Sequence, residues 1–167
     1  MTSMMWDRHR GHADSYDVVD TGFNYRMDEP RAALAMPRMP RLEAEIERRR
    51  ELTLVYRERL AGVPGIILPY TAQDVSRSSC YVMPIMLTNP HRRATLRRVL
   101  REHHQVQTSI LYPAIHEFSV YRQRYPDVSL PRTEQAARAE VTIPLYPHMS
   151  GAEQERVLHA IEQALDA

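Results

Sequence analysis

"VTIPLYPHMSGAEQERVLHAIEQAL", residues 141–165, joins a short apolar segment to a longer periodic one. The β-branched start at 141–145 predicts a short strand. Ser150, followed three residues later by Glu153, is a capping-box pattern and predicts that a helix begins there. The apolar residues after this cap share one helical face that the protein is expected to bury: Val157, Leu158, Ile161 and Leu165. A strand followed by such a helix indicates a sheet covered by helices.

Short strands and helices alternate over the rest of the chain as well. The predicted segments are extended at 66–70, 78–88 and 105–111, and helical at 91–104, at 132–139 and in a short stretch through Tyr121. Pro84 lies inside the second extended segment and suggests an edge strand or a bulge. The expected fold class is therefore α/β, with a small antiparallel or mixed sheet packed with helices.

A long helical region precedes these strands. Asp28 is a good N-cap for a helix that runs to about Met36. Pro37 and Pro40 follow, and each costs about 3 kcal/mol or more inside a continuous helix. We therefore expect a break or sharp kink at 37–40. A second helix follows, and its buried face is predicted to contain Leu42, Ile46, Leu52, Tyr56 and Leu60.

Size and composition suit one soluble domain. The chain has 167 residues, of which 43% are hydrophobic and 26% charged. No apolar run approaches the ~20 residues of a membrane helix, and the first residues do not resemble a secretory signal. The 22 basic and 21 acidic residues nearly balance, which argues against non-specific binding of nucleic acid. A single cysteine, Cys80, in a strand-like segment fits a cytoplasmic location.

Every one of the 22 basic residues is arginine, so the sequence contains no lysine. A GC-rich genome, which favours arginine codons, is a sufficient explanation of this bias. Its chemical consequence is that no side-chain amine is available to form a Schiff base. Arginine cannot replace lysine in this role, because its guanidinium group stays protonated at any working pH.

Six segments, in order, resemble the carboxy-terminal part of the DegT/DnrJ/StrS sugar aminotransferases. They are "GFNYRMDEPRAAL" (22–34), "RLEAEIERRRELTLVYRERL" (41–60), "SSCYVMPIML" (78–87), "VQTSILYPAIHEFSVYR" (106–122), "LPRTEQAA" (130–137) and "TIPLYPHMSGAEQERV" (142–157). These fold-type I enzymes use pyridoxal 5′-phosphate (PLP) on nucleotide-linked sugars. The resemblance implies a loop remnant at 1–21, linking helices at 22–62 and a carboxy-terminal small α/β domain at 63–167.

The same resemblance implies roles at the amino-terminal end of the match. In the family, the asparagine of the G-x-N-Y-R motif, here Asn24, contacts the cofactor phosphate of the neighbouring subunit. An amide NH₂ can donate to a phosphate oxygen without a counter-charge. The alternative is that Asn24 shapes the turn before the helix. Arg26 is expected either to border the substrate site or to pair with Asp28 or Glu29.

A second group of site residues is implied in the segment "LYPAIHEF" (111–118). Tyr112 and His116 occupy the positions where the family's loop approaches the sugar-nucleotide substrate. Many members have a histidine where this chain has Leu111, which weakens the expectation that the loop takes part directly in the chemistry. Alternatively, His116 is a solvated or capping residue. We expect no catalytic residue and no metal site in this chain.

The leading hypothesis is a carboxy-terminal fragment of a PLP-dependent sugar-nucleotide aminotransferase that is inactive alone. The lysine that binds PLP belongs, in the family, to a large amino-terminal domain, so this chain is expected to hold no PLP covalently. The family implies a homodimer, or a partner large domain or full-length aminotransferase. One alternative is a free-standing, non-catalytic module that dimerises or binds a partner. Another is that Met1 is internal to a full enzyme.

Overall fold

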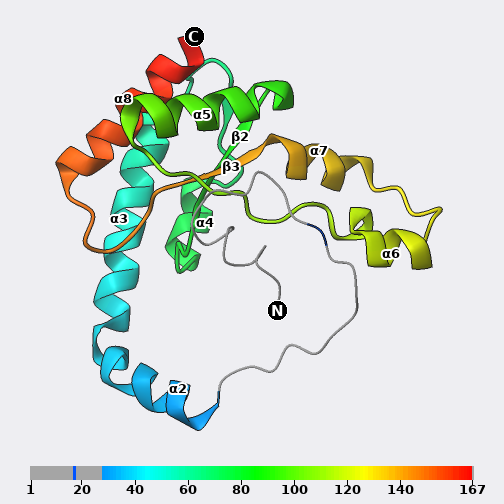
Figure 1. Ribbon diagram of the computed structural model, residues 1–167. Helices are drawn as coiled ribbons and strands as arrows, with labels where there is room; N and C mark the ends of the chain where they lie inside the picture. The colour runs from blue at the N-terminus through cyan, green and yellow to red at the C-terminus, as the bar shows by residue number, and fades with distance from the viewer. Residues whose placement is uncertain (1–16, 18–27, 167) are drawn as a thin grey trace.

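The computed structural model describes residue 17 and residues 28–166 of the chain. Its centre is a three-stranded antiparallel sheet in the order β1-β2-β3. The strands are β1 (Ile66–Ile67), β2 (Met83–Leu87) and β3 (Glu140–Ile143). Helices lie around this sheet, as Figure 1 shows. The expected α/β fold class is therefore confirmed, and the sheet is antiparallel rather than mixed.

One face of the sheet forms the core with three helices. The register places Met83 opposite Ile143 and Ile85 opposite Val141, so their side chains share a face, because side chains alternate along a strand. This face packs against α3 (Leu42–Leu60), α5 (Arg93–His104) and α8 (Gly151–Asp166). The helices contribute the buried residues Leu52, Tyr56, Leu60, Leu96, Leu100, Val157, Leu158 and Ile161. The predicted buried face of the last helix lies in this cluster.

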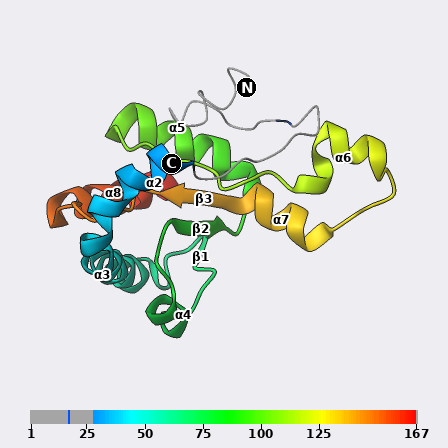
Figure 2. The same ribbon diagram turned by 90° about the horizontal axis from the view of Figure 1, so that it is seen from below.

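The other face of the sheet carries Pro84, Met86, Glu140 and Thr142. Figure 2 shows β3 continuing from α7 (Pro131–Ala139), which extends to one side with α6 (Ser119–Arg124). The segment between Leu111 and the short 3-10 helix η3 (Ile115–Glu117) lies near this face. The candidate site is built here.

Pro84 lies in the central strand of the sheet, so the expectation of an edge strand is wrong. The main-chain N–H of Thr142 donates to the carbonyl of Ser109 at 2.8 Å, and the carbonyl of Thr142 accepts from the N–H of Ser109 at 2.9 Å. Thr142 and Pro84 are therefore a non-hydrogen-bonded pair in the β2–β3 ladder. The missing donor of Pro84 points to the β1 side, where the ladder has ended at Ile67. Pro84 thus has the local surroundings of an edge residue within a central strand.

Two predicted strands are shorter in the structure. The segment 105–111 forms only an isolated bridge between Ser109 and Thr142. Gln105 is the left-handed C-cap of α5 (φ 57°). The carbonyl of Thr108 accepts from the side chain of Arg97, and the N–H of Leu111 donates to the side chain of Glu140, so side chains take two backbone groups of this segment. The segment 78–88 becomes a strand only at Met83, because Cys80 has a positive φ of 46°.

Helix α4 (Ala72–Arg77) was not expected. Its N-cap is Thr71, whose side chain accepts from the main-chain N–H of Asp74, and Asp74 accepts in return from Thr71. This capping box comes soon after the short strand β1, with residues 68–70 between them. The sequence signal T-x-x-D was therefore present but lies close to Gly and Pro residues that indicate a loop.

The expected N-cap at Asp28 is confirmed: its carboxylate accepts from the main-chain N–H of Arg31 at 2.9 Å. The first helix, α2, spans Glu29–Ala35. The expected break at 37–40 is confirmed: the α-helix is interrupted there by a 3-10 helix, η1 (Met36–Arg41), which contains Pro40 and leads into α3. Of the predicted α3 face, Leu52, Tyr56 and Leu60 are buried, whereas Leu42 is exposed.

Before α5, a 3-10 turn, η2 (Pro90–Arg92), is capped by the side chain of Asn89. In the described part of the chain, no helix is both long and apolar enough to cross a membrane.

Candidate functional site

A groove of about 410 Å³ runs between the second face of the sheet and α7. Pro84, Met86 and Glu140 lie on the sheet side, and Ala136 and Ala137 on the α7 side. The segment from Leu111 to Ile115 forms its border, which brings Tyr112 to the rim. Most of the lining is apolar, and Glu140 adds a carboxyl group.

Glu140 is the first residue of β3, and only 7% of its surface is exposed. One carboxylate oxygen accepts from the main-chain N–H of Leu111 at 2.8 Å, and the other accepts from the hydroxyl of Thr142 at 2.5 Å. Burial raises the pKa of Glu140, and these two hydrogen bonds and the charges of Arg93 and Arg97 oppose that rise only in part. Sequence reasoning missed this residue.

His116 faces α7. Its Nε2 lies 3.1 Å from the carboxylate of Glu134, and its side chain is 12% exposed. Glu134 also accepts from the main-chain N–H of Leu130 at 3.0 Å. The hydrogen bond with His116 is the main reason that the pKa of Glu134 is lowered. His116 is therefore a contact between η3 and α7, and neither a solvated residue nor a cap.

Arg138 strengthens the same attachment. Its guanidinium group lies 2.9 Å from the carboxylate of Glu117 in η3 and 3.4 Å from that of Glu134 in α7. Arg138 of α7 therefore forms an ion pair across to η3 as well as one within its own helix. Exposed ion pairs of this kind contribute little individually. Together with the His116 contact, they hold the end of the Leu111–Ile115 segment against α7.

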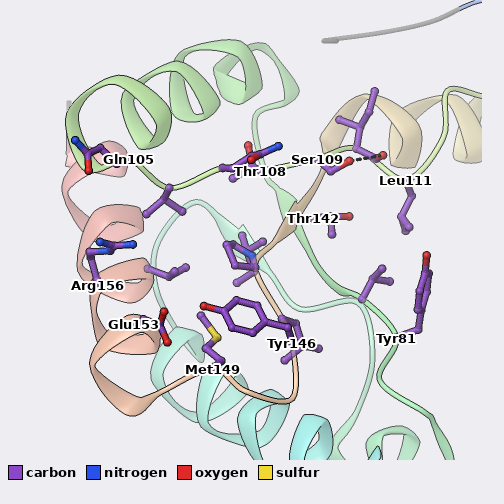
Figure 3. A pocket seen from close by; sticks show the side chains of 18 of the residues that line it. Tyr81, Gln105, Thr108, Ser109, Leu111, Thr142, Tyr146, Met149, Glu153 and Arg156 are labelled. Atoms are coloured by element: carbon purple, nitrogen blue, oxygen red, sulfur yellow. Dashed lines mark hydrogen bonds between the residues drawn. The ribbon is translucent and has the colours of Figure 1, made fainter. Parts of the chain in front are cut away.

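Tyr112 is 58% exposed and also borders a second cavity, of about 560 Å³. Figure 3 shows this cavity between the 105–111 segment, the end of β3 and the start of α8. Tyr146 lies near its centre, with Glu153 and Arg156 projecting from α8 and Tyr81 on the opposite side. Phenol, carboxylate and guanidinium groups around such a space can hydrogen-bond a hydroxyl-rich ligand.

The α8 side of this cavity is acidic at the helix start. Glu153 accepts from both the main-chain N–H and the hydroxyl of Ser150 at 2.8 Å, which confirms the predicted capping box. These bonds, followed by the bond from Tyr146, lower the pKa of Glu153. Partial desolvation, followed by the bond to Glu153, raises the pKa of Tyr146. The carboxylate of Glu153 thus caps the start of α8, and the guanidinium group of Arg156 adds a positive charge to the lining of the cavity.

The structure brings Tyr112 and His116 onto one segment but directs them differently, Tyr112 to the two openings and His116 to α7. Asn24 and Arg26 lie outside the described residues. PLP needs an amine to hold it covalently, and the sequence contains no lysine. No side chain of this sequence therefore fits the role of the amine that holds PLP as a Schiff base.

The family model of the DegT/DnrJ/EryC1/StrS aminotransferases matches residues 3–162. Among solved structures, the aminotransferase TlmJ from Streptoalloteichus hindustanus is similar with a TM-score of 0.74 and 25% identity, over 90% of this chain and 40% of TlmJ. S. venezuelae DesV, solved in complex with a ketimine intermediate, has a TM-score of 0.72 and 30% identity, over 96% of this chain and 43% of DesV.

NtdA from Bacillus subtilis, solved with bound cofactor PMP, is similar with a TM-score of 0.73 and 27% identity, over 93% of this chain and 36% of NtdA. The chain thus spans well under half the length of each of these three structures.

Proposed function

Because the chain belongs to the DegT/DnrJ/EryC1/StrS aminotransferase family, we propose that it is the small-domain part of a PLP-dependent sugar-nucleotide aminotransferase. In this proposal residues 63–167 are the small domain, residues 22–62 link it to a large domain, and residues 1–21 are part of a loop. The proposed reaction transfers an amino group, usually from glutamate, to a keto sugar carried on a nucleotide.

The observation that carries this proposal is the absence of lysine from a member of a PLP-dependent family. The amine that holds PLP must then come from a segment outside this sequence, and the chain alone is expected to be inactive. A large domain fits this role, since the chain spans 36–43% of the three solved structures described above.

Exposed apolar side chains support a large domain as the partner. Tyr70, Tyr81, Tyr112 and Ile115 are more than half exposed, and Leu111 lies among them at the border of the groove and the cavity. Apolar surface gathered in one region indicates an interaction site rather than a solvated surface. We infer that the large domain covers this region and that Tyr112 then borders the shared active site.

The remaining site residues have proposed roles within this frame. Asn24 would donate to the PLP phosphate of the neighbouring subunit in a homodimer, and Arg26 would border the sugar-nucleotide together with Tyr112. His116 would act on the substrate through the loop that it holds, because its Nε2 is already engaged by Glu134.

The proposal can be tested by covalent trapping. The purified chain is incubated with PLP, reduced with borohydride and analysed by peptide mass mapping. We expect a pyridoxyl group only at the terminal α-amine, and no conversion of glutamate to 2-oxoglutarate with a nucleotide-linked keto sugar. A pyridoxyl group on an internal residue, or turnover by the chain alone, would overturn the proposal.

A free-standing module that dimerises or binds a partner is the second candidate. The buried cluster of α3, α5, α8 and the sheet favours it, because that core is formed entirely by this chain. Gel filtration with light scattering separates the two candidates. A free-standing module should elute as a discrete monomer or dimer, whereas a domain with an uncovered partner surface should form progressively larger, heterogeneous aggregates as concentration rises.

A further inference from the structure

We propose that Glu140 is a positioning residue that sets the geometry of the Leu111–His116 loop. Glu140 touches the loop rather than the substrate. This positioning role rests on the proposed function only in that the loop is taken to border the substrate.

Glu140 holds the loop next to a second attachment. Its carboxylate binds the main-chain N–H of Leu111 at 2.8 Å, while the main chain of Thr142, two residues along β3, binds Ser109 in both directions. The hydroxyl of Thr142 donates to the other oxygen of Glu140 at 2.5 Å. The backbone on either side of Ile110 is therefore bound to Glu140 and Thr142 of β3.

The far end of the loop is tied to a different element, by the contact of His116 with Glu134 on α7. Between these two attachments, Tyr112 and Ile115 are exposed while Ala114 is buried. Glu140 binds the main chain immediately before Tyr112, so the direction of the Tyr112 side chain depends on this carboxylate.

The chemistry of Glu140 is unusual for a residue that only stabilises a fold. An ionised carboxylate with 7% exposure loses most of its hydration, and an apolar residue in such a place is often neutral or stabilising. Arg93 and Arg97 of α5 are the charged groups that act on it, but their guanidinium groups donate to the carbonyl of Ala137 and to Thr108. Among the described residues, one carboxylate oxygen of Glu140 accepts from the loop at Leu111, and the other accepts from the hydroxyl of Thr142, which orients the carboxylate along β3.

The test is amide hydrogen exchange by NMR on the full chain. In Glu140→Ala, the amide of Leu111 should exchange on the order of tenfold faster or more, after correction for the change in global stability. The ring signals of Tyr112 should shift as well. Glu140→Gln keeps a carbonyl acceptor for Leu111 and should restore most of the protection. Should the alanine variant not fold, Glu140→Asp, whose side chain is too short to reach Leu111, should show the same local acceleration.

Gln154→Ala is the matched control. Gln154 is also buried, and its amide donates to the carbonyl of Leu52 at 2.7 Å, a contact that joins α8 to α3 and does not involve the loop. Gln154→Ala should change the amide exchange rate of Leu111 only as far as it lowers the global stability of the chain. If the Glu140 variants alter Leu111 and Tyr112 no more than Gln154→Ala does, the positioning role is wrong. The PLP trapping experiment does not depend on Glu140, so failure of the proposed function would be seen separately.

Discussion

Two buried polar groups on α3 should respond in opposite directions to loss of a hydroxyl. Tyr56 is fully buried, and its hydroxyl donates to the carbonyl of Pro144 at 3.0 Å, which joins α3 to the loop before α8. Tyr56→Phe leaves that carbonyl without its donor and should lower the free energy of unfolding by about 1–2 kcal/mol. For a chain of this size, this corresponds to a fall in Tm of roughly 2–8 °C.

Thr53, three residues earlier on the same helix, provides the opposing case. Its buried hydroxyl oxygen has no hydrogen-bond partner among the described residues. Thr53→Val removes a hydroxyl whose burial is uncompensated and should raise the free energy of unfolding by about 1 kcal/mol.

Urea unfolding followed by far-ultraviolet circular dichroism measures both changes, provided that the m-value stays the same as in the parent chain. The reasoning fails if Tyr56→Phe is as stable as the parent, because the bond to Pro144 would then contribute nothing. It also fails if Thr53→Val is destabilised by about 1 kcal/mol or more, because the hydroxyl would then have a partner that stabilises the fold.

Two further predictions concern pH. Burial raises the pKa of Tyr56 well above its ordinary value. The neutral phenol therefore makes its full contribution to the free energy of unfolding below about pH 10, and this contribution should be lost as the pH rises further. In Tyr56→Phe, the free energy of unfolding should decline less steeply at alkaline pH. The hydrogen bond with His116 lowers the pKa of Glu134. The ionised Glu134 therefore stabilises the fold above the ordinary glutamate pKa, about 4.3, and this contribution to the free energy of unfolding should be lost as the pH falls below that value. Between pH 5 and pH 3, the free energy of unfolding should therefore fall less for Glu134→Gln than for the parent chain. An equal fall in both would contradict this prediction.

Local sequence signals predicted the helices and the chemical limits of the chain. The caps at Asp28 and Ser150 act within three residues, so the sequence alone located the starts of α2 and α8. The apolar periodicity of the last helix identified its buried face for the same reason. The absence of lysine needs no structure at all, and it leaves no side-chain amine that could hold PLP as a Schiff base.

The strands were predicted less well because their limits depend on neighbours. The segment 105–111 has strand-like composition, yet the side chain of Arg97 from α5 binds the backbone carbonyl of Thr108. Pro84 could be central only because β1 ends before reaching it. Neither circumstance is visible within a short window of sequence.

The site residues show the same division. The sequence identified Tyr112 and His116 as members of one loop, but it could not determine that one would be exposed at two openings and the other bound to α7. Glu140 lies 29 residues from Leu111 and Glu134 lies 18 residues from His116, so only the packing of β3 and α7 brings these groups together. Helix caps and apolar periodicity depend on residues a few positions apart, so they can be recognised in the sequence. Burial and long-range hydrogen bonds form only when separate elements pack together.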